Sequence, residues 1–129
     1  MSREAADAEQ EQPTIVCLCG SSRFKEAFAQ AAAAEALAGR IVLSLGIFSQ
    51  ADGIELSTEQ VELQHLLHRR RIDMADEVLV INPSSYGGES TREEIEYAIT
   101  CSGFYVGEST REEIEYAIAC GKRVRWLNE

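Results

Sequence analysis

The sequence predicts an α/β fold built on a parallel sheet of four to five strands with flanking helices. Short apolar runs of strand length alternate with longer segments of helical character, and Gly- and Ser-rich segments directly follow two of the apolar runs. Such alternation is typical of parallel strands joined by crossover helices. The chain has 129 residues, which suits a single domain over residues 13–129.

Four segments have the composition of strands. Residues 14–19 (TIVCLC) and 77–81 (EVLVI) are largely apolar, which is typical of strands buried on both faces of a parallel sheet. Residues 41–45 form another short apolar run. Residues 123–127 (RVRWL) alternate charged and apolar side chains, so we expect a less buried edge strand that exposes Trp126.

Helices are expected between these strands. Residues 24–37 are rich in Ala, and Gly39 is placed to end that helix. The next helix starts at Ser57, which forms an S-x-x-Q capping pattern with Gln60. Residues 46–56 show no clear period, so we expect a loop there.

The net charge excludes some classes of partner. Twelve basic against 22 acidic residues give a net charge of −10, which argues against a nucleic-acid polymer and an anionic membrane surface. No window approaches the roughly 18 apolar residues of a membrane span. Residues 1–12 are polar and acidic, so we expect a disordered leader and no secretory signal.

The cysteines indicate a reduced protein. Cys17 and Cys19 alternate on a predicted strand, so both face one side and make a poor mutual disulfide. Cys101 and Cys120 are copies of each other within a repeat. No Cys/His spacing resembles a zinc site, so we expect no metal. A reduced, cytoplasmic protein is expected by default.

The chain contains an internal duplication. Residues 88–99 (GESTREEIEYAI) recur letter for letter as residues 107–118, within tandem copies 88–106 and 107–125. Either residues 102–106 form a brief extra strand or one copy forms a surplus helix. We favour the first copy in the functional position, because it leaves the third predicted strand at the edge where ligands bind.

Two Gly- and Ser-rich loops follow predicted strands. Gly20, Ser21, Ser22 and Arg23 follow the first strand, and residues 82–90 follow the third. Ligands of parallel sheets bind beyond the carboxyl ends of the strands, where such loops meet. Backbone N–H groups and an arginine suit an anion such as phosphate. The alternative is an ordinary helix cap by Ser21 or Ser22.

Glu94 is a candidate nucleophile. It lies near the start of the helix in the first copy, where the helix dipole favours an ionised carboxylate. Tyr97 is three residues later on the same face, in position to orient that carboxylate. The alternative is a capping box, with Ser90 or Thr91 as the N-cap residue.

The helix that starts at Ser57 carries further ionisable residues. It runs antiparallel to the strand it precedes, so we expect Asp73 and Asp76 near the opposite edge of the sheet, as helix-end or turn residues. His68 precedes Asp76 by eight residues, so it lies ~12 Å nearer the ligand edge than Asp76 does and can reach the site. The alternative is an exposed surface histidine. Residues 69–71 (RRR) are expected to form a solvated face.

Four segments resemble the nucleoside 2-deoxyribosyltransferase-like family, which includes the 2′-deoxynucleoside 5′-phosphate N-hydrolases. They are CLCGSSRF, HRRRIDMADEVLVINP, YGGESTREEIEYA and GKRV, and the resemblance covers residues 14–127. It implies a flavodoxin-like or Rossmann-like sheet and an enzyme that acts on N-glycosidic bonds of deoxynucleosides or their monophosphates. It implies no cofactor.

The resemblance also implies roles for single residues. Glu94, or its duplicate Glu113, attacks the anomeric carbon and forms a covalent deoxyribosyl ester. His68 stands where the family often has an acidic residue, and a histidine there can protonate the leaving base. Asn82 replaces an aspartate of the family. Together with Tyr97, the candidate substrate-binding residues are Gly20, Ser21, Ser22, Arg23, Asn82, Gly88 and Ser90.

Two other functions stay open. One is a nucleotide-binding module without turnover, and the other is a scaffold of the same fold that carries a duplicated insert. The segment SYGGESTREE is also similar to the glycine-rich loop of nucleoside-monophosphate phosphoribohydrolases. We expect a small-molecule nucleoside or nucleotide as partner, and an exposed edge strand is compatible with a homo-oligomer.

Overall fold

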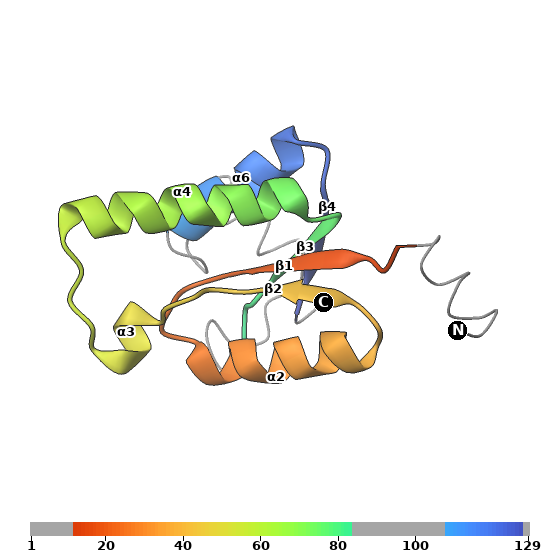
Figure 1. Cartoon of the computed structure of the whole chain (residues 1–129), viewed down its shortest axis with the longest axis horizontal. Helices are drawn as coiled ribbons and strands as arrows, with labels where there is room; N and C mark the ends of the chain where they lie inside the picture. Colours follow the sequence, from red (N-terminus) through yellow and green to blue (C-terminus); the bar gives the residue numbers. More distant parts are fainter. Residues whose placement is uncertain (1–11, 84–107, 128–129) are drawn as a thin grey trace.

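A computed structural model describes residues 12–83 and 108–127 (Figure 1). Within these residues four parallel strands form one sheet in the order β2-β1-β3-β4. This confirms the predicted α/β class, and the strand order is that of the first four strands of a flavodoxin-like sheet. The elements are β1 (Ile15–Cys19), α2 (Lys25–Leu37), β2 (Ile41–Leu43), α3 (Ser49–Asp52), α4 (Thr58–Met74), β3 (Glu77–Val80), α6 (Glu108–Ala119) and β4 (Arg123–Trp126).

The helices form layers on both faces of the sheet. In Figure 1, α4 and α6 lie on one side of the strands and α2 lies on the other. Successive residues of β1 therefore contribute to two different cores, because side chains alternate along a strand. One core joins β1, β3 and β4 to α4 and α6, and it contains Cys17, Cys19, Ile72, Ala75, Val78, Val80, Ile114, Ala117 and Trp126. The other joins β1 and β3 to α2, and it contains Val16, Leu18, Phe28, Ala31, Leu79 and Ile81.

Local signals at the helix ends are confirmed. Ser57 Oγ accepts a hydrogen bond from the Gln60 backbone N–H at 3.1 Å, and the Gln60 side chain accepts one from the Ser57 backbone N–H at 2.9 Å. This reciprocal capping box fixes the start of α4. Gly39 follows the end of α2 with a φ of 90°, a conformation that favours glycine. None of the described helices is both long and apolar enough to cross a membrane.

Asp73, in the last turn of α4, and Asp76, just after that helix, lie away from the ligand edge, as predicted. The Asp76 carboxylate accepts a hydrogen bond of 2.8 Å from the backbone N–H of Ile15, the first residue of β1. Asp73 accepts hydrogen bonds from the Tyr116 hydroxyl and from Arg70. Asp76 therefore connects the end of α4 to the amino-terminal edge of the sheet, and Asp73 connects α4 to α6.

The prediction of an unbroken loop over residues 46–56 is wrong, because the structure contains the short helix α3 there. This helix is held by contacts with residues distant in the sequence. Lys25 forms an ion pair of 2.9 Å with Asp52, and Ser22 Oγ lies 3.4 Å from Ser49 Oγ. A four-residue helix has too few residues to show a hydrophobic period, so its sequence carries no such signal.

The expected exposure of Trp126 is also wrong. Although β4 is an edge strand in the described sheet, the Trp126 side chain is only 5% exposed. It faces the layer of α4 and α6 and belongs to the same core cluster as Ile114 and Ala117. Edge position in a sheet exposes the backbone of a strand, but the face that helices cover stays buried.

The second copy of the duplication supplies α6, which leads into β4 as its position in the sequence predicts. Residues 1–11, the first copy and the possible extra strand over residues 102–106 lie outside the described residues.

Gly20→Ala is expected to destabilise the protein by about 1–3 kcal/mol, because a side chain there overpacks the sheet edge. A Cβ atom at this position would lie 3.0 Å from the Ile81 carbonyl oxygen and 3.3 Å from a Phe28 ring carbon. Urea unfolding measures the effect. Gly46→Ala is the matched control, since a Cβ atom there would lie 3.6 Å from the Arg71 guanidinium, an ordinary contact. Equal loss of stability in both variants would contradict the prediction.

Candidate functional site

A pocket of about 320 Å³ opens at the carboxyl ends of β1 and β3. This is the edge at which parallel sheets bind ligands, and its volume falls in the range of small-molecule sites. Loops after β1 and β2 and the facing sides of α4 and α6 form its walls. The lining residues are Gly20, Ser21, Ser22, Arg23, Phe24, Leu45, Ile47, Ser49, Gln50, Leu56, Val61, Gln64, His65, His68, Arg71, Ile81, Thr110 and Glu113.

The loop over residues 20–23 forms one wall of the pocket, and its two serines form hydrogen bonds with α3. The Ser21 hydroxyl donates a hydrogen bond of 2.7 Å to the Gln50 side chain, and Ser22 Oγ accepts one from the Gln50 backbone N–H. The N-cap residue of α2 is Phe24, and no side chain caps that helix. The alternative of a serine helix cap is therefore wrong, and the hydroxyls serve instead to shape the pocket wall.

Glu113 and His68 meet at the floor of the pocket. His68 Nε2 lies 3.2 Å from Glu113 Oε1, and the two side chains are 2% and 15% exposed. Glu113 comes from α6 and His68 from α4, two helices that pack side by side on the same face of the sheet. Among the described residues the Glu113 carboxylate thus contacts His68, and it also lines the pocket.

The environment of His68 favours its protonated form. Burial lowers the pKa of His68, but the hydrogen bond and the negative charge of Glu113 raise it, and the net result is a pKa above the ordinary value. The Glu113 carboxylate therefore faces an imidazole that holds a proton over a wider pH range than a free histidine.

This raised pKa predicts a pH-dependent stability. A folded state that binds the His68 proton more tightly than the unfolded state gains stability that is fully present below about pH 6.5 and is lost as pH rises through the raised pKa. We expect the free energy of unfolding, measured by urea with a chelator, to fall over this window. His68→Gln removes this part of the slope, and His65→Gln is the matched control. An unchanged slope in His68→Gln would exclude the coupling.

The prediction that residues 69–71 all form a solvated face is wrong for Arg71. It is half-buried and lines the pocket, because it lies three residues after His68 on the same face of α4. Arg70 forms an ion pair of 2.8 Å with Asp73, and Arg69 lies over the Tyr116 ring. Only the outer part of this basic run is exposed.

Several predicted site residues are brought together in this pocket, and others are not. The four residues of the 20–23 loop, His68 and Glu113 line it. Asn82 follows β3 and is buried, 6% exposed, and it is not among the described lining residues. The predicted residues outside the described part of the chain are Gly88, Ser90, Glu94 and Tyr97.

The second copy differs in detail from the prediction made for the first. The described part of α6 spans Glu108–Ala119, so Thr110 lies inside the helix and is not the N-cap residue that a capping box with Glu113 would require. The Tyr116 hydroxyl, the counterpart of Tyr97, donates to Asp73 at 2.5 Å. Neither the cap nor the tyrosine therefore orients Glu113, and His68 does so instead.

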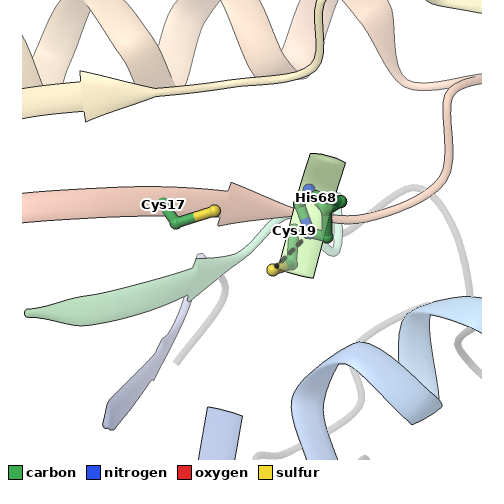
Figure 2. Close-up of side chains that lie close together, drawn as sticks. All are labelled: Cys17, Cys19 and His68. Carbon is green, nitrogen blue, oxygen red and sulfur yellow. Dashed lines mark hydrogen bonds between the residues drawn. The ribbon is translucent and has the colours of Figure 1, made fainter. Parts of the chain in front are cut away.

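Sequence reasoning missed a cluster formed by Cys17, Cys19 and His68. Cys19 Sγ lies 3.1 Å from His68 Nε2. Figure 2 shows this pair together with Cys17, which lies two residues earlier in β1. A C-x-C pair with a histidine 49 residues away has no familiar metal-site spacing, so only the packing of α4 on β1 reveals it. A hydrogen bond with Cys19 lowers the pKa of Cys17, and the same bond, with burial, raises the pKa of Cys19.

No protein-family model, curated protein or solved structure matches the chain. The chemistry of the pocket is therefore the basis on which a function is proposed.

Proposed function

We propose that this chain cleaves or transfers the N-glycosidic bond of 2-deoxyribonucleosides or their 5′-monophosphates, with Glu113 as the nucleophile. The observation that carries the proposal is the position of Glu113, whose carboxylate contacts His68 at 3.2 Å and lines one pocket with the 20–23 loop. A retaining glycosyl transfer needs a fixed, ionised carboxylate that is open to the sugar but largely shielded from water.

The reaction proceeds in two displacements at the anomeric carbon. A Glu113 oxygen forms a bond to C1′ while the base leaves with the electron pair of the N-glycosidic bond and takes up a proton. Water or a second base then attacks C1′ from the opposite face and releases the carboxylate. Two inversions give overall retention.

The contact with Glu113 supports a positioning role for His68. The base leaves from the side of the sugar opposite the nucleophile, whereas His68 Nε2 lies 3.2 Å from the nucleophilic carboxylate. His68 then holds the Glu113 carboxylate in place. His65 lies three residues earlier in α4 and also lines the pocket, so it is the imidazole better placed to protonate the leaving base.

The charges of the pocket support an anionic substrate. Arg23 and Arg71 line the pocket, and Glu113 is the only carboxylate among the described lining residues. The pocket is thus locally cationic in a chain of net charge −10. A 5′-monophosphate provides the anion that such guanidinium groups bind.

A substrate panel tests the proposal. The full chain, in buffer with a chelator, is incubated with each deoxynucleoside and each 5′-monophosphate, and free base is measured by chromatography. We expect base release that favours the monophosphates, and exchange when a second base is added identifies transfer. Thermal stabilisation by these ligands without product would instead indicate a binding module. If the chain shows neither base release nor thermal stabilisation with any of these compounds, the proposal is excluded.

A further inference from the structure

The buried cluster of Cys17, Cys19 and His68 has a donor set that the proposed reaction does not use as a whole. One ligand atom from each residue, two sulfurs and an imidazole nitrogen, lie within 4.8 Å of one another. The three residues are 0%, 0% and 2% exposed, and they lie between β1 and α4 (Figure 2).

We propose that Cys17, Cys19 and His68 bind one thiophilic divalent cation, such as Zn²⁺, at the floor of the pocket, and that the bound ion withdraws His68 from Glu113. The first part depends only on the ligand geometry. The second part rests on the proposed function of Glu113.

The geometry is close to that of a tetrahedral site. Zinc bonds of about 2.3 Å to sulfur and about 2.0 Å to nitrogen place neighbouring ligand atoms about 3.5–3.8 Å apart. The Cys19–His68 separation of 3.1 Å is already near this value, and the largest separation in the cluster requires a contraction of about 1 Å. His68 Nδ1 is buried and has no hydrogen-bond partner among the described residues, so no second bond locks the ring.

The chemistry of the donors selects the kind of ion. Two sulfurs and one imidazole favour Zn²⁺, Co²⁺ or Cd²⁺ over Mg²⁺ or Ca²⁺, which prefer oxygen ligands. Two thiolates neutralise a divalent ion, so the complex with Cys17, Cys19 and a neutral His68 has no net charge. Binding releases the thiol protons, which makes proton release a direct measure of coordination.

Of the three proposed ligands only His68 lines the pocket, together with Glu113, so a fourth ligand is expected from the pocket side. Glu113 Oε1 lies 3.2 Å from His68 Nε2, so either this carboxylate or a water molecule from the pocket can complete a tetrahedron. In both cases the metal takes the lone pair of the nitrogen that otherwise contacts Glu113. The metal-bound protein therefore lacks the His68–Glu113 hydrogen bond on which the proposed nucleophile depends.

Cobalt binding to the reduced full chain tests the site without any assay of activity. The double variant Cys101→Ser/Cys120→Ser is the matched control, because it removes the other two thiols, including the exposed Cys120, and keeps the cluster. We expect wild type and control to bind one Co²⁺ with sulfur-to-cobalt charge-transfer and tetrahedral d–d bands. Cys17→Ala and Cys19→Ala, checked for native helix content by circular dichroism, are expected to lose these bands.

His68→Gln keeps both buried thiols and gives a second test if the alanine variants do not fold. Its cobalt affinity is expected to fall at least about tenfold, with altered d–d bands, because one of three protein ligands is lost. Absent charge-transfer bands in the wild type, or full binding by folded Cys19→Ala, would overturn the metal site. Full glycosyl-transfer activity of the cobalt-bound protein would overturn the second part, that the ion withdraws His68 from Glu113. Cobalt binding by a chain that never turns over substrate would leave the metal site in place and exclude the proposed function.

Discussion

Glu113→Gln is expected to reduce kcat/KM for base release at least about a thousandfold, because an amide cannot form the glycosyl ester. Glutamine has the shape of glutamate and can still contact His68, whose Nε2 lies 3.2 Å from the Glu113 carboxylate. The fold should therefore survive the change. Steady-state base release measures the loss, and circular dichroism with urea unfolding checks the structure.

The chain itself offers two comparisons for this variant. Glu115→Gln makes the same change on the exposed side of α6 and is expected to keep the parent activity. Glu94→Gln makes it at the duplicate position in the first copy, and since Glu113 already occupies the pocket beside His68, we expect activity to remain there too. Loss in Glu94→Gln together with full activity in Glu113→Gln would assign the reaction to the first copy and contradict the proposal.

Arg125→Ala is expected to lower the free energy of unfolding by about 2–4 kcal/mol, because it leaves two buried carboxylates without their main partner. Arg125 Nη2 lies 2.5 Å from Glu35 and 2.7 Å from Glu77, whose side chains are 11% and 8% exposed. Arg40 is a second but more distant partner, at 3.4 Å from Glu35 and 3.9 Å from Glu77. It compensates only part of the loss.

Arg123→Ala is the matched control on the same strand. The Arg123 side chain is 74% exposed and its guanidinium lies 4.0 Å from Glu77, so its removal is expected to change the free energy of unfolding by less than about 0.5 kcal/mol. Urea unfolding of both variants at neutral pH provides the measurement. Equal destabilisation by the two substitutions would mean that the burial of Glu35 and Glu77 does not set the cost.

Features that depend on local sequence were predicted well. Residues 14–19 and 77–81 are largely apolar because strands of a parallel sheet are buried on both faces, and they contain β1 and β3. Ser57 and Gln60 need only each other to form the capping box that starts α4. The antiparallel course of α4 then placed Asp76 at the amino-terminal edge of the sheet, where it binds the backbone of β1.

Features that depend on contacts between distant segments were missed. Nothing local to Trp126 indicates that α4 and α6 cover its face of β4, and nothing local to Arg71 indicates a pocket beside it. The short helix α3 exists through contacts with the loop after β1 and the start of α2. Each of these is decided by which elements pack together, a property that no window of sequence contains.

The sequence by itself determined the class of fold, the succession of strands and helices along the chain and the candidate site residues. It did so because hydrophobic periodicity and residue type act over a few neighbouring residues. Only the tertiary structure decided that Glu113 meets His68 and that two strand cysteines lie against the same imidazole. Those contacts join residues that lie about 45 to 50 positions apart in the sequence, and the packing of α4 and α6 on one face of the sheet creates them.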